Sequence, residues 1–415
     1  MTTSHPSSSR RTVLKGMAAS AGIGAVASVA SGPASIALPR LATPAAAAAP
    51  PGRVVVVFLR GGIDGLSACV PYNEAEYYNR RPGISISPGA VTDLDGQFGL
   101  HPAMAPLHDL YTQGRFAIVE AVGNPSANRS HFEAAAYWEQ GTTGNSPSGF
   151  GWLARHLLSS TGLPGAEFRA VGLGSNSVRS LGGYTDALVM SSLERFSLGG
   201  VGGFGGLYRD QLEMLYYGQG PGEVTGTNAL GAVDQIAGLV AANPGSGTYD
   251  DTAATLEDAR VLLGAGLGVE VITVDIGHWD THSAMGTETA GRMYDLLDDL
   301  ATNLVNFQAG LDADGHSDVT TVIMSEFGRR VRENGSGGCD HGWGNIMMAM
   351  GGGIAGNQVL GSWPGLAPGA LVSGDLAITT DYRDVLAEIV RDRLGNTDLA
   401  SVFPGHTVTP VGLTL

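Results

Sequence analysis

Two short clusters of aspartate and histidine contain the residue types in this sequence best suited to chemistry. The first cluster is GHWDTH at residues 277–282, and the second is CDHGWG at residues 339–344. Carboxylate oxygens and imidazole nitrogens ligate divalent metals, and together they also form acid–base pairs. Both clusters follow predicted buried strands, where α/β proteins position functional side chains. The clusters therefore predict a metal site or an acid–base pair.

The spacing within each cluster indicates how the side chains would be used. Asp280 and His282 are two residues apart, so in an extended segment they face the same side and can reach one metal. Asp340 and His341 are adjacent. They can ligate two different metals, or His341 can ligate one metal with Asp340 as its outer partner.

Two more acidic residues follow predicted strands. Asp64 lies among glycines in GGIDG, and Glu326 lies in SEFGRR. Each is placed as a metal ligand would be, although Asp64 is equally typical of a turn before a helix. Arg329 or Arg330, close to Glu326, is a candidate for binding an anionic substrate, and at least one of them is expected to be surface charge.

Ser130 is expected at the start of a helix that follows the second predicted strand. A serine nucleophile there would be activated by the helix-start amides, which stabilise negative charge. The same position also suits an ordinary capping box, because Glu133 follows three residues later.

The elements that must position these residues alternate between strands and helices. Apolar runs predict strands at residues 53–62, 116–122, 269–276, 319–324 and 346–350. Helical patterns fall at residues 102–114, 130–140, 289–311 and 381–394. We therefore expect an α/β fold with a mostly parallel central sheet and helices on both faces. Residues 53–415 would form one domain, with a Gly-rich insertion at about 175–250 that includes a helical segment at 207–219.

The amino-terminal segment has the features of an export signal. The sequence SRRTVLK at residues 9–15 is a twin-arginine motif, followed by a weakly apolar stretch and an Ala-rich linker up to residue 52. This pattern predicts export by the Tat translocon to the periplasm, the cell surface or the medium. The rest of the sequence has no apolar run of about 20 residues, so no stable membrane anchor is expected.

Charge and composition exclude several classes of protein. The formal charge is −16, and removal of residues 1–52 lowers it to −20 because that segment contains four basic residues and no acid. This argues against nucleic acid as a partner. Lys15 is the only lysine, which excludes a Schiff-base enzyme and a Walker-A loop after export.

Other familiar motifs are absent or lack their context. Two G-x-G-x-x-G patterns, at residues 200–205 and 351–356, lack the strand–turn–helix setting of a dinucleotide site, and no G-x-S-x-G elbow occurs. The two cysteines, Cys69 and Cys339, could form one disulfide after export or remain separate buried thiols.

Five segments of the chain together resemble a known family. They are FLRGGIDGL, LHPAMAPLHDLY, NRSHFEAAAYWEQG, WDTH, and SEFGR followed by DHGWG. In this order they resemble the exported family known as domain of unknown function 1501, over about residues 52–404. That family is grouped with the alkaline-phosphatase-like superfamily, which includes sulfatases and phosphodiesterases.

The superfamily pattern matches this sequence unevenly. Asp64 matches its first metal-binding aspartate, and Ser130 matches its nucleophile, although the following glycine comes one residue late. Asp280 and His282 are two residues apart, where the superfamily usually has four.

The later ligands of the pattern depart further. Glu326 and Phe327 stand where an aspartate and a histidine are expected, and His341 matches a later solitary histidine. The substitution by Phe327 removes one ligand. The resemblance therefore implies a one-metal site, or a site that has lost activity.

The resemblance implies an exported metal-dependent hydrolase of phosphate or sulfate esters. Its substrate would be a small-molecule or polymer ester, with Ser130 as nucleophile and Arg329 binding the substrate. The ion would be zinc, calcium, magnesium or manganese, in a number left open, held by residues among Asp64, Asp280, His282, Glu326, Asp340 and His341. A non-catalytic binding or scaffold protein on a degraded fold is the alternative, and a cofactor-loaded oxidoreductase is a third.

Overall fold

The computed structural model describes residues 52–126, 128–144, 149–162, 166, 168–174, 178–196, 209–211, 213–214, 221–242 and 251–415. The twin-arginine motif, the first G-x-G-x-x-G pattern and most of the helical segment expected at residues 207–219 lie outside this described part.

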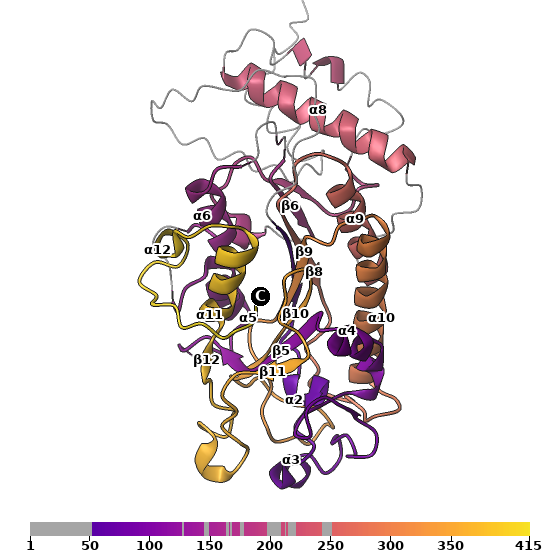
Figure 1. Cartoon of the computed structure of the whole chain (residues 1–415), viewed down its shortest axis with the longest axis vertical. Helices are drawn as coiled ribbons and strands as arrows, with labels where there is room; N and C mark the ends of the chain where they lie inside the picture. The colour runs from indigo at the N-terminus through magenta and orange to yellow at the C-terminus, as the bar shows by residue number, and fades with distance from the viewer. Residues whose placement is uncertain are drawn as a thin grey trace, which may run out of the picture.

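A nine-stranded sheet forms the centre of the described chain (Figure 1). Its strands are β1 (Arg53–Leu59), β5 (Phe116–Gly123), β6 (Ala170–Leu173), β7 (Leu188–Met190), β8 (Val271–Ile276), β9 (Val319–Met324), β10 (Asn345–Gly351), β11 (Gln358–Leu360) and β12 (Thr380–Asp381). Their order is β11–β5–β10–β9–β1–β8–β6–β7, with β12 also paired to β5. β10 runs antiparallel to β5 and β9, and the other pairs are parallel. The expected mostly parallel α/β sheet is confirmed.

Strand β1 lies in the middle of the sheet because its side chains are apolar on both faces. Its sequence is RVVVVFL, and all seven residues are buried. Successive side chains of a strand point to opposite faces. Val55, Val57 and Leu59 accordingly join one core, and Val54 and Phe58 join the other.

Helices cover both faces of the sheet, as Figure 1 shows. One face packs against the 3₁₀ helix η1 (Pro102–Leu107), α4 (His108–Thr112), α9 (Thr252–Gly264) and α10 (Arg292–Ala313). The other packs against α5 (His131–Gln140), α6 (Trp152–Ser159), α11 (Tyr382–Glu388), a π-helical turn (Ile389–Arg393) and α12 (Leu399–Val402). Leu300 in α10 and Trp138 in α5 are fully buried. Burial of a leucine side chain such as Leu300 contributes about 1.5–3 kcal/mol.

Smaller elements surround this frame. They are α2 (Gly65–Ala68), α3 (Ala75–Arg80), η2 (Arg179–Leu181), α8 (Pro221–Ala242), η4 (Pro368–Ala370) and a three-stranded sheet of β2 (Cys69–Val70), β3 (Thr92–Asp93) and β4 (Gly99–Leu100). Among the described residues, no helix combines the length and apolar character needed to cross a membrane.

Local details differ from the expected pattern. The segment at residues 102–114 begins as a 3₁₀ helix that contains Pro106, which has no amide hydrogen to donate. The closing helix changes to a π-helical turn before it ends at Gly395, whose φ is 65°. Strand β7 falls within residues 175–250, so part of the expected insertion is an edge strand of the central sheet.

Candidate metal centre

Loops after the parallel strands meet at their carboxyl-terminal edge. β1 pairs with both β8 and β9, and Leu59 lies opposite Ile276 where the first pair ends. Gly61 has a φ of 124°, and a Cβ there would lie 2.5 Å from the amide nitrogen of Asp280. A larger residue would not fit this approach. The loops that follow β1 and β8 therefore pack directly against each other.

His131, Asp280 and His341 form the candidate metal centre, which we call the His–Asp–His triad. One ligand atom from each lies within 4.8 Å of the others. Nε2 of His341 is 3.2 Å from Oδ1 of Asp280, and Nε2 of His131 is 3.6 Å from Oδ2. The three side chains are between 22% and 44% exposed, so a substrate can reach them. His131 begins α5, Asp280 follows β8, and His341 precedes β10.

Each histidine of the triad is oriented through its second ring nitrogen. Nδ1 of His131 lies 2.8 Å from Oε1 of Glu326, and Nδ1 of His341 lies 2.9 Å from the backbone oxygen of Arg129. An acceptor at Nδ1 holds the proton there and leaves Nε2 free, as in histidines that ligate metals. Nε2 of His131 is buried and has no hydrogen-bond partner in the described part of the chain. This donor set fits a metal ion.

His282 contacts two members of the triad. Its Nε2 lies 2.9 Å from Nε2 of His341 and 3.0 Å from Oδ1 of Asp280. A proton or a cation must lie between two imidazole nitrogens this close, because their lone pairs would otherwise face each other. Nitrogens bound to one tetrahedral ion at about 2.0–2.1 Å would be separated by about 3.3 Å. His282 therefore lies beside the triad, where it either shares a proton with His341 or faces the same cation.

Glu326 and Asp340 contact the histidines from outside the triad. Glu326 is buried, and its Oε1 accepts the amide of Gly61 at 2.8 Å as well as facing His131. The Asp340 side chain is 60% exposed, and its Oδ1 lies 3.4 Å from Nδ1 of His282. Both carboxylates are therefore placed to orient imidazole rings.

Phe327 supplies an apolar wall to the site. Its ring centroid lies 4.9 Å from that of His131 and 4.8 Å from that of His341.

The pKa values of these two imidazoles are shifted in opposite directions. The hydrogen bond to Glu326 raises the pKa of His131, whereas burial lowers the pKa of His341. A neutral His341 is the form that ligates a metal.

The side chain of Arg329 holds the loops of this site together. Its side chain is fully buried, and it donates to the backbone oxygens of Gly61, Gly62 (2.7 Å) and Cys339 (3.2 Å). It also donates to Oδ1 of Asp280 at 2.6 Å. Burial opposes ionisation of Asp280, but Arg329 outweighs it and holds the pKa of that carboxyl below its usual value. Arg329 therefore joins the loops and positions Asp280.

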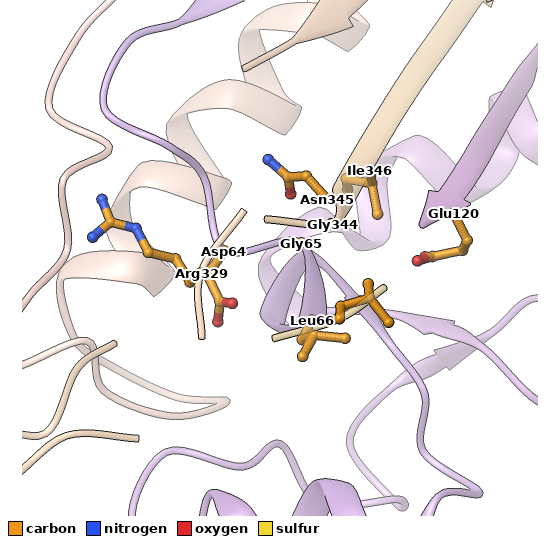
Figure 2. A pocket seen from close by; sticks show the side chains of 9 residues that line it. Asp64, Gly65, Leu66, Glu120, Arg329, Gly344, Asn345 and Ile346 are labelled. Atoms are coloured by element: carbon orange, nitrogen blue, oxygen red, sulfur yellow. The ribbon is translucent and has the colours of Figure 1, made fainter. Parts of the chain in front are cut away.

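Asp64 is fully buried and has partners of its own. Arg81 donates to both of its oxygens, at 2.5 and 2.9 Å, and the hydroxyl of Ser67 donates to Oδ2 at 2.6 Å. Figure 2 shows Asp64 and Arg329 on one side of a small pocket, which Glu120 faces from the other side. The carboxylate of Asp64 is thus used in a buried ion pair.

Ser130 lies at the rim of the site, directly before His131. It is exposed, and its side chain makes no capping hydrogen bond at the start of α5. The expected capping box is not formed, because Glu133 accepts a hydrogen bond from the side chain of Asn128 at 2.8 Å. The hydroxyl of Ser130 is therefore not committed to capping the helix.

The sequence and the structure select overlapping sets of residues. Among the residues singled out in the sequence, the structure gathers Asp280, His282, Glu326, Asp340 and His341 around one point. Sequence reasoning missed His131, although it follows Ser130 directly and begins the same helix. Its position at the start of a helix after a strand was the signal that could have found it.

The two cysteines are separate buried thiols in the structure. Burial raises the pKa of Cys339 to about 12 and that of Cys69 well above its usual value. Neither thiol is therefore a ready thiolate ligand or nucleophile.

A model of the family described as "Protein of unknown function (DUF1501)" matches residues 226–414, which confirms the family resemblance in that part of the chain. No curated protein matches the sequence. Solved structures similar to this chain include the lipoteichoic acid synthase LtaP from Listeria monocytogenes, at 10% identity and a TM-score of 0.38 over 86% of this chain and 75% of that one. Another is Ps i-CgsB in complex with k-i-k-neocarrahexaose, at 10% identity and a TM-score of 0.37 over 85% of this chain and 74% of that one.

Proposed function

We propose that this protein is an exported, metal-dependent hydrolase of phosphate or sulfate esters. The observation that carries the proposal is the His–Asp–His triad, with two oriented imidazoles and a position that a substrate can reach. An accessible metal site with few protein ligands is typical of hydrolytic centres, whereas structural sites are closed. The ester class follows from the resemblance of the sequence segments to the sulfatase-like superfamily.

The donor set narrows the choice of metal. His131, Asp280 and His341 would hold the ion, which leaves the fourth position of a tetrahedral site open to a substrate. Imidazole nitrogens favour zinc and other transition metals, whereas calcium and magnesium prefer oxygen ligands. Among zinc, calcium, magnesium and manganese, we therefore propose zinc. Such an ion supplies a positive charge that polarises the ester and favours deprotonation of an attacking hydroxyl.

Ser130 is the proposed nucleophile. Its hydroxyl is exposed, and it lies at the start of α5, where helix-start amides favour negative charge. Its Oγ would bond to the phosphorus or sulfur atom as the alcohol leaves. Water would then cleave the Oγ–P or Oγ–S bond, which releases sulfate, phosphate or, from a diester, a phosphate monoester, and restores the serine.

Two buried side chains position the triad in this proposal. Arg329 holds Asp280 in place, and Glu326 keeps the ring of His131 oriented. Neither needs to touch the substrate. Arg329, proposed from the sequence as a substrate-binding residue, is in our proposal a positioning residue because its donors are directed to the protein.

Export is part of the proposal. The motif SRRTVLK supports passage through the Tat translocon, to the periplasm, the cell surface or the medium. The formal charge of −16 counts against nucleic acid as a partner. A small-molecule or polymer ester remains the proposed substrate.

Turnover on a panel of esters tests the proposal. Zinc-loaded protein would be assayed with an aryl phosphate, an aryl phosphodiester and an aryl sulfate. We expect metal-dependent hydrolysis of at least one ester, lost in Ser130→Ala and retained in His278→Ala, a control exposed in the same loop as Asp280. Inert protein on all three esters, or full activity of Ser130→Ala, would contradict the proposal.

A non-catalytic binding protein is the second candidate. Its supporting observation is the buried pairing of Asp64 with Arg81, together with Phe327 beside the histidines. Asp64, which matches the first metal ligand of the superfamily pattern, is then paired with Arg81 and does not bind a metal. A purified glycan or protein that binds wild type and His341→Ala equally, with no ester turned over, would favour this candidate.

A further inference from the structure

Arg129 and Arg330 approach the same buried carboxylate beside the triad. Asp375 is fully buried, and Nη2 of Arg129 donates to its Oδ2. Nε of Arg330 lies 3.7 Å from Oδ1 of the same residue. Two guanidinium groups around one carboxylate leave an excess positive charge, in a chain whose formal charge is −16. This local excess would attract an anion.

Both guanidinium groups keep donors that the described residues do not use. The Arg129 side chain is 33% exposed, and its Nε, which is itself covered, has no hydrogen-bond partner in the described part of the chain. The Arg330 side chain is 37% exposed, and its 3.7 Å contact with Asp375 is too long for a hydrogen bond. Each guanidinium offers five N–H groups in a planar fork. The pair can therefore donate to a bound group.

The pair is held next to the triad. The guanidinium of Arg129 lies 4.9 Å from the ring centroid of Trp343, and its backbone oxygen is the partner of His341. The amide of Arg330 donates to the backbone oxygen of Asp340 at 2.9 Å. These contacts tie both arginines to the segments that form the metal centre.

We propose that Arg129 and Arg330 form an oxyanion-binding subsite for the phosphate or sulfate group of the substrate. Guanidinium groups bind tetrahedral oxyanions through paired hydrogen bonds. Arg329 is not suited to this task, because its donors are directed to backbone oxygens and Asp280. The identity of the substrate rests on the proposed function, but the subsite binds free anions without turnover.

Anion titration of the full chain, stripped of metal, tests the subsite. Inorganic phosphate and inorganic sulfate would be titrated separately by calorimetry. Loss of one paired contact is expected to weaken binding about tenfold in Arg129→Gln and in Arg330→Gln. Arg115→Gln is the matched control, because Arg115 is 30% exposed, pairs with Asp312 and precedes β5 rather than following it.

Asp375→Asn gives a result in the opposite direction. It removes the competing negative charge, so anion binding is expected to tighten, whereas a purely structural role for the carboxylate predicts weaker binding. Absence of saturable binding in wild type, or wild-type affinity in both arginine variants, would overturn the subsite. Anion binding without ester turnover would retain the subsite and contradict the hydrolase.

Discussion

Asp64 and Asp280 follow neighbouring strands of the sheet, yet their surroundings differ. The Asp64 side chain is fully buried and paired with Arg81. The Asp280 side chain is 44% exposed: Arg329 donates to its Oδ1, but Oδ1 also faces His341 and Oδ2 faces His131. The position of an aspartate after a strand therefore does not decide its role. Its partners decide whether it stabilises the fold or is available to a metal.

The neighbours Arg329 and Arg330 repeat this contrast. The side chain of Arg329 is fully buried, and its donors are used by backbone oxygens and Asp280. The side chain of Arg330 is 37% exposed, and its Nε lies 3.7 Å from Asp375, too far for a hydrogen bond. A buried cation fixes loops, whereas an open one can bind a ligand.

The largest effect is expected from breaking the buried ion pair. Asp64→Ala leaves Arg81 charged and unpaired, so the free energy of unfolding should fall by about 3–5 kcal/mol. Urea unfolding followed by circular dichroism measures the change. Asp312→Ala is the control, because Asp312 pairs with Arg115 at the surface and should cost about 1 kcal/mol or less. Equal losses of unfolding free energy in Asp64→Ala and Asp312→Ala would show that the buried ion pair contributes no more than the surface pair.

Asp280→Asn should act on metal binding. It removes the charged ligand of the triad. Zinc affinity should therefore fall by about a hundredfold or more, because loss of a residue that only orients a ligand already costs about 10–100-fold. Competition with a chromophoric chelator measures the affinity. Asp340→Asn is the matched control, since that carboxylate faces only His282 among the site histidines and is 60% exposed. A weaker effect for Asp280→Asn than for Asp340→Asn would refute the assignment.

Glu326→Gln should have a smaller effect, because Glu326 acts through His131. Loss of the carboxylate that orients a ligating histidine typically weakens metal binding by about 10–100-fold. The same chelator competition measures this change, and urea unfolding of the metal-free protein checks the fold. Unchanged affinity, or a fall in stability that accounts for the loss, would show that Glu326 has only a structural role.

Glu120 extends the comparison to a buried acid with no cation paired to it in the described part of the chain. Neither carboxylate oxygen has a hydrogen-bond partner in the described part of the chain, and burial raises the pKa of Glu120 from 4.5 to about 8. Between these values the folded state holds a proton that the unfolded state releases. The free energy of unfolding should therefore fall as pH rises through this window, by at most about 1.4 kcal/mol per pH unit, and level off above it.

Glu120→Gln tests this pH dependence. The variant cannot titrate, so its stability should be flatter than that of wild type between pH 5 and pH 8, a window taken from the raised pKa of about 8. Urea unfolding at several pH values gives the slopes. Parallel slopes for the two proteins would mean that Glu120 does not carry the effect.

Much of the fold could be predicted because its elements are locally encoded. The run RVVVVFL predicts a buried strand, and the structure places β1 in the middle of the sheet. The antiparallel direction of β10 could not be read from its sequence, because an apolar run buries a strand equally well in either direction. Short strands such as β6 and β7 carry too few residues for a clear pattern.

The candidate site was partly predictable for the same reason. Asp280 and His282 were expected to face one side, and their side chains lie 3.0 Å apart. The pairing of Asp64 with Arg81 depends on tertiary contacts, which local spacing does not reveal. His131 needed the position of α5 relative to β8, which the structure supplies.

Metal stoichiometry tests the central claim most directly. Purified protein would be stripped, reloaded with zinc, desalted and analysed by inductively coupled plasma mass spectrometry. We predict one tightly bound ion per chain, lost in His131→Ala and retained in the exposed control His278→Ala. Zinc retained by His131→Ala, or no zinc bound by wild type, would contradict the assignment of the triad as a metal centre.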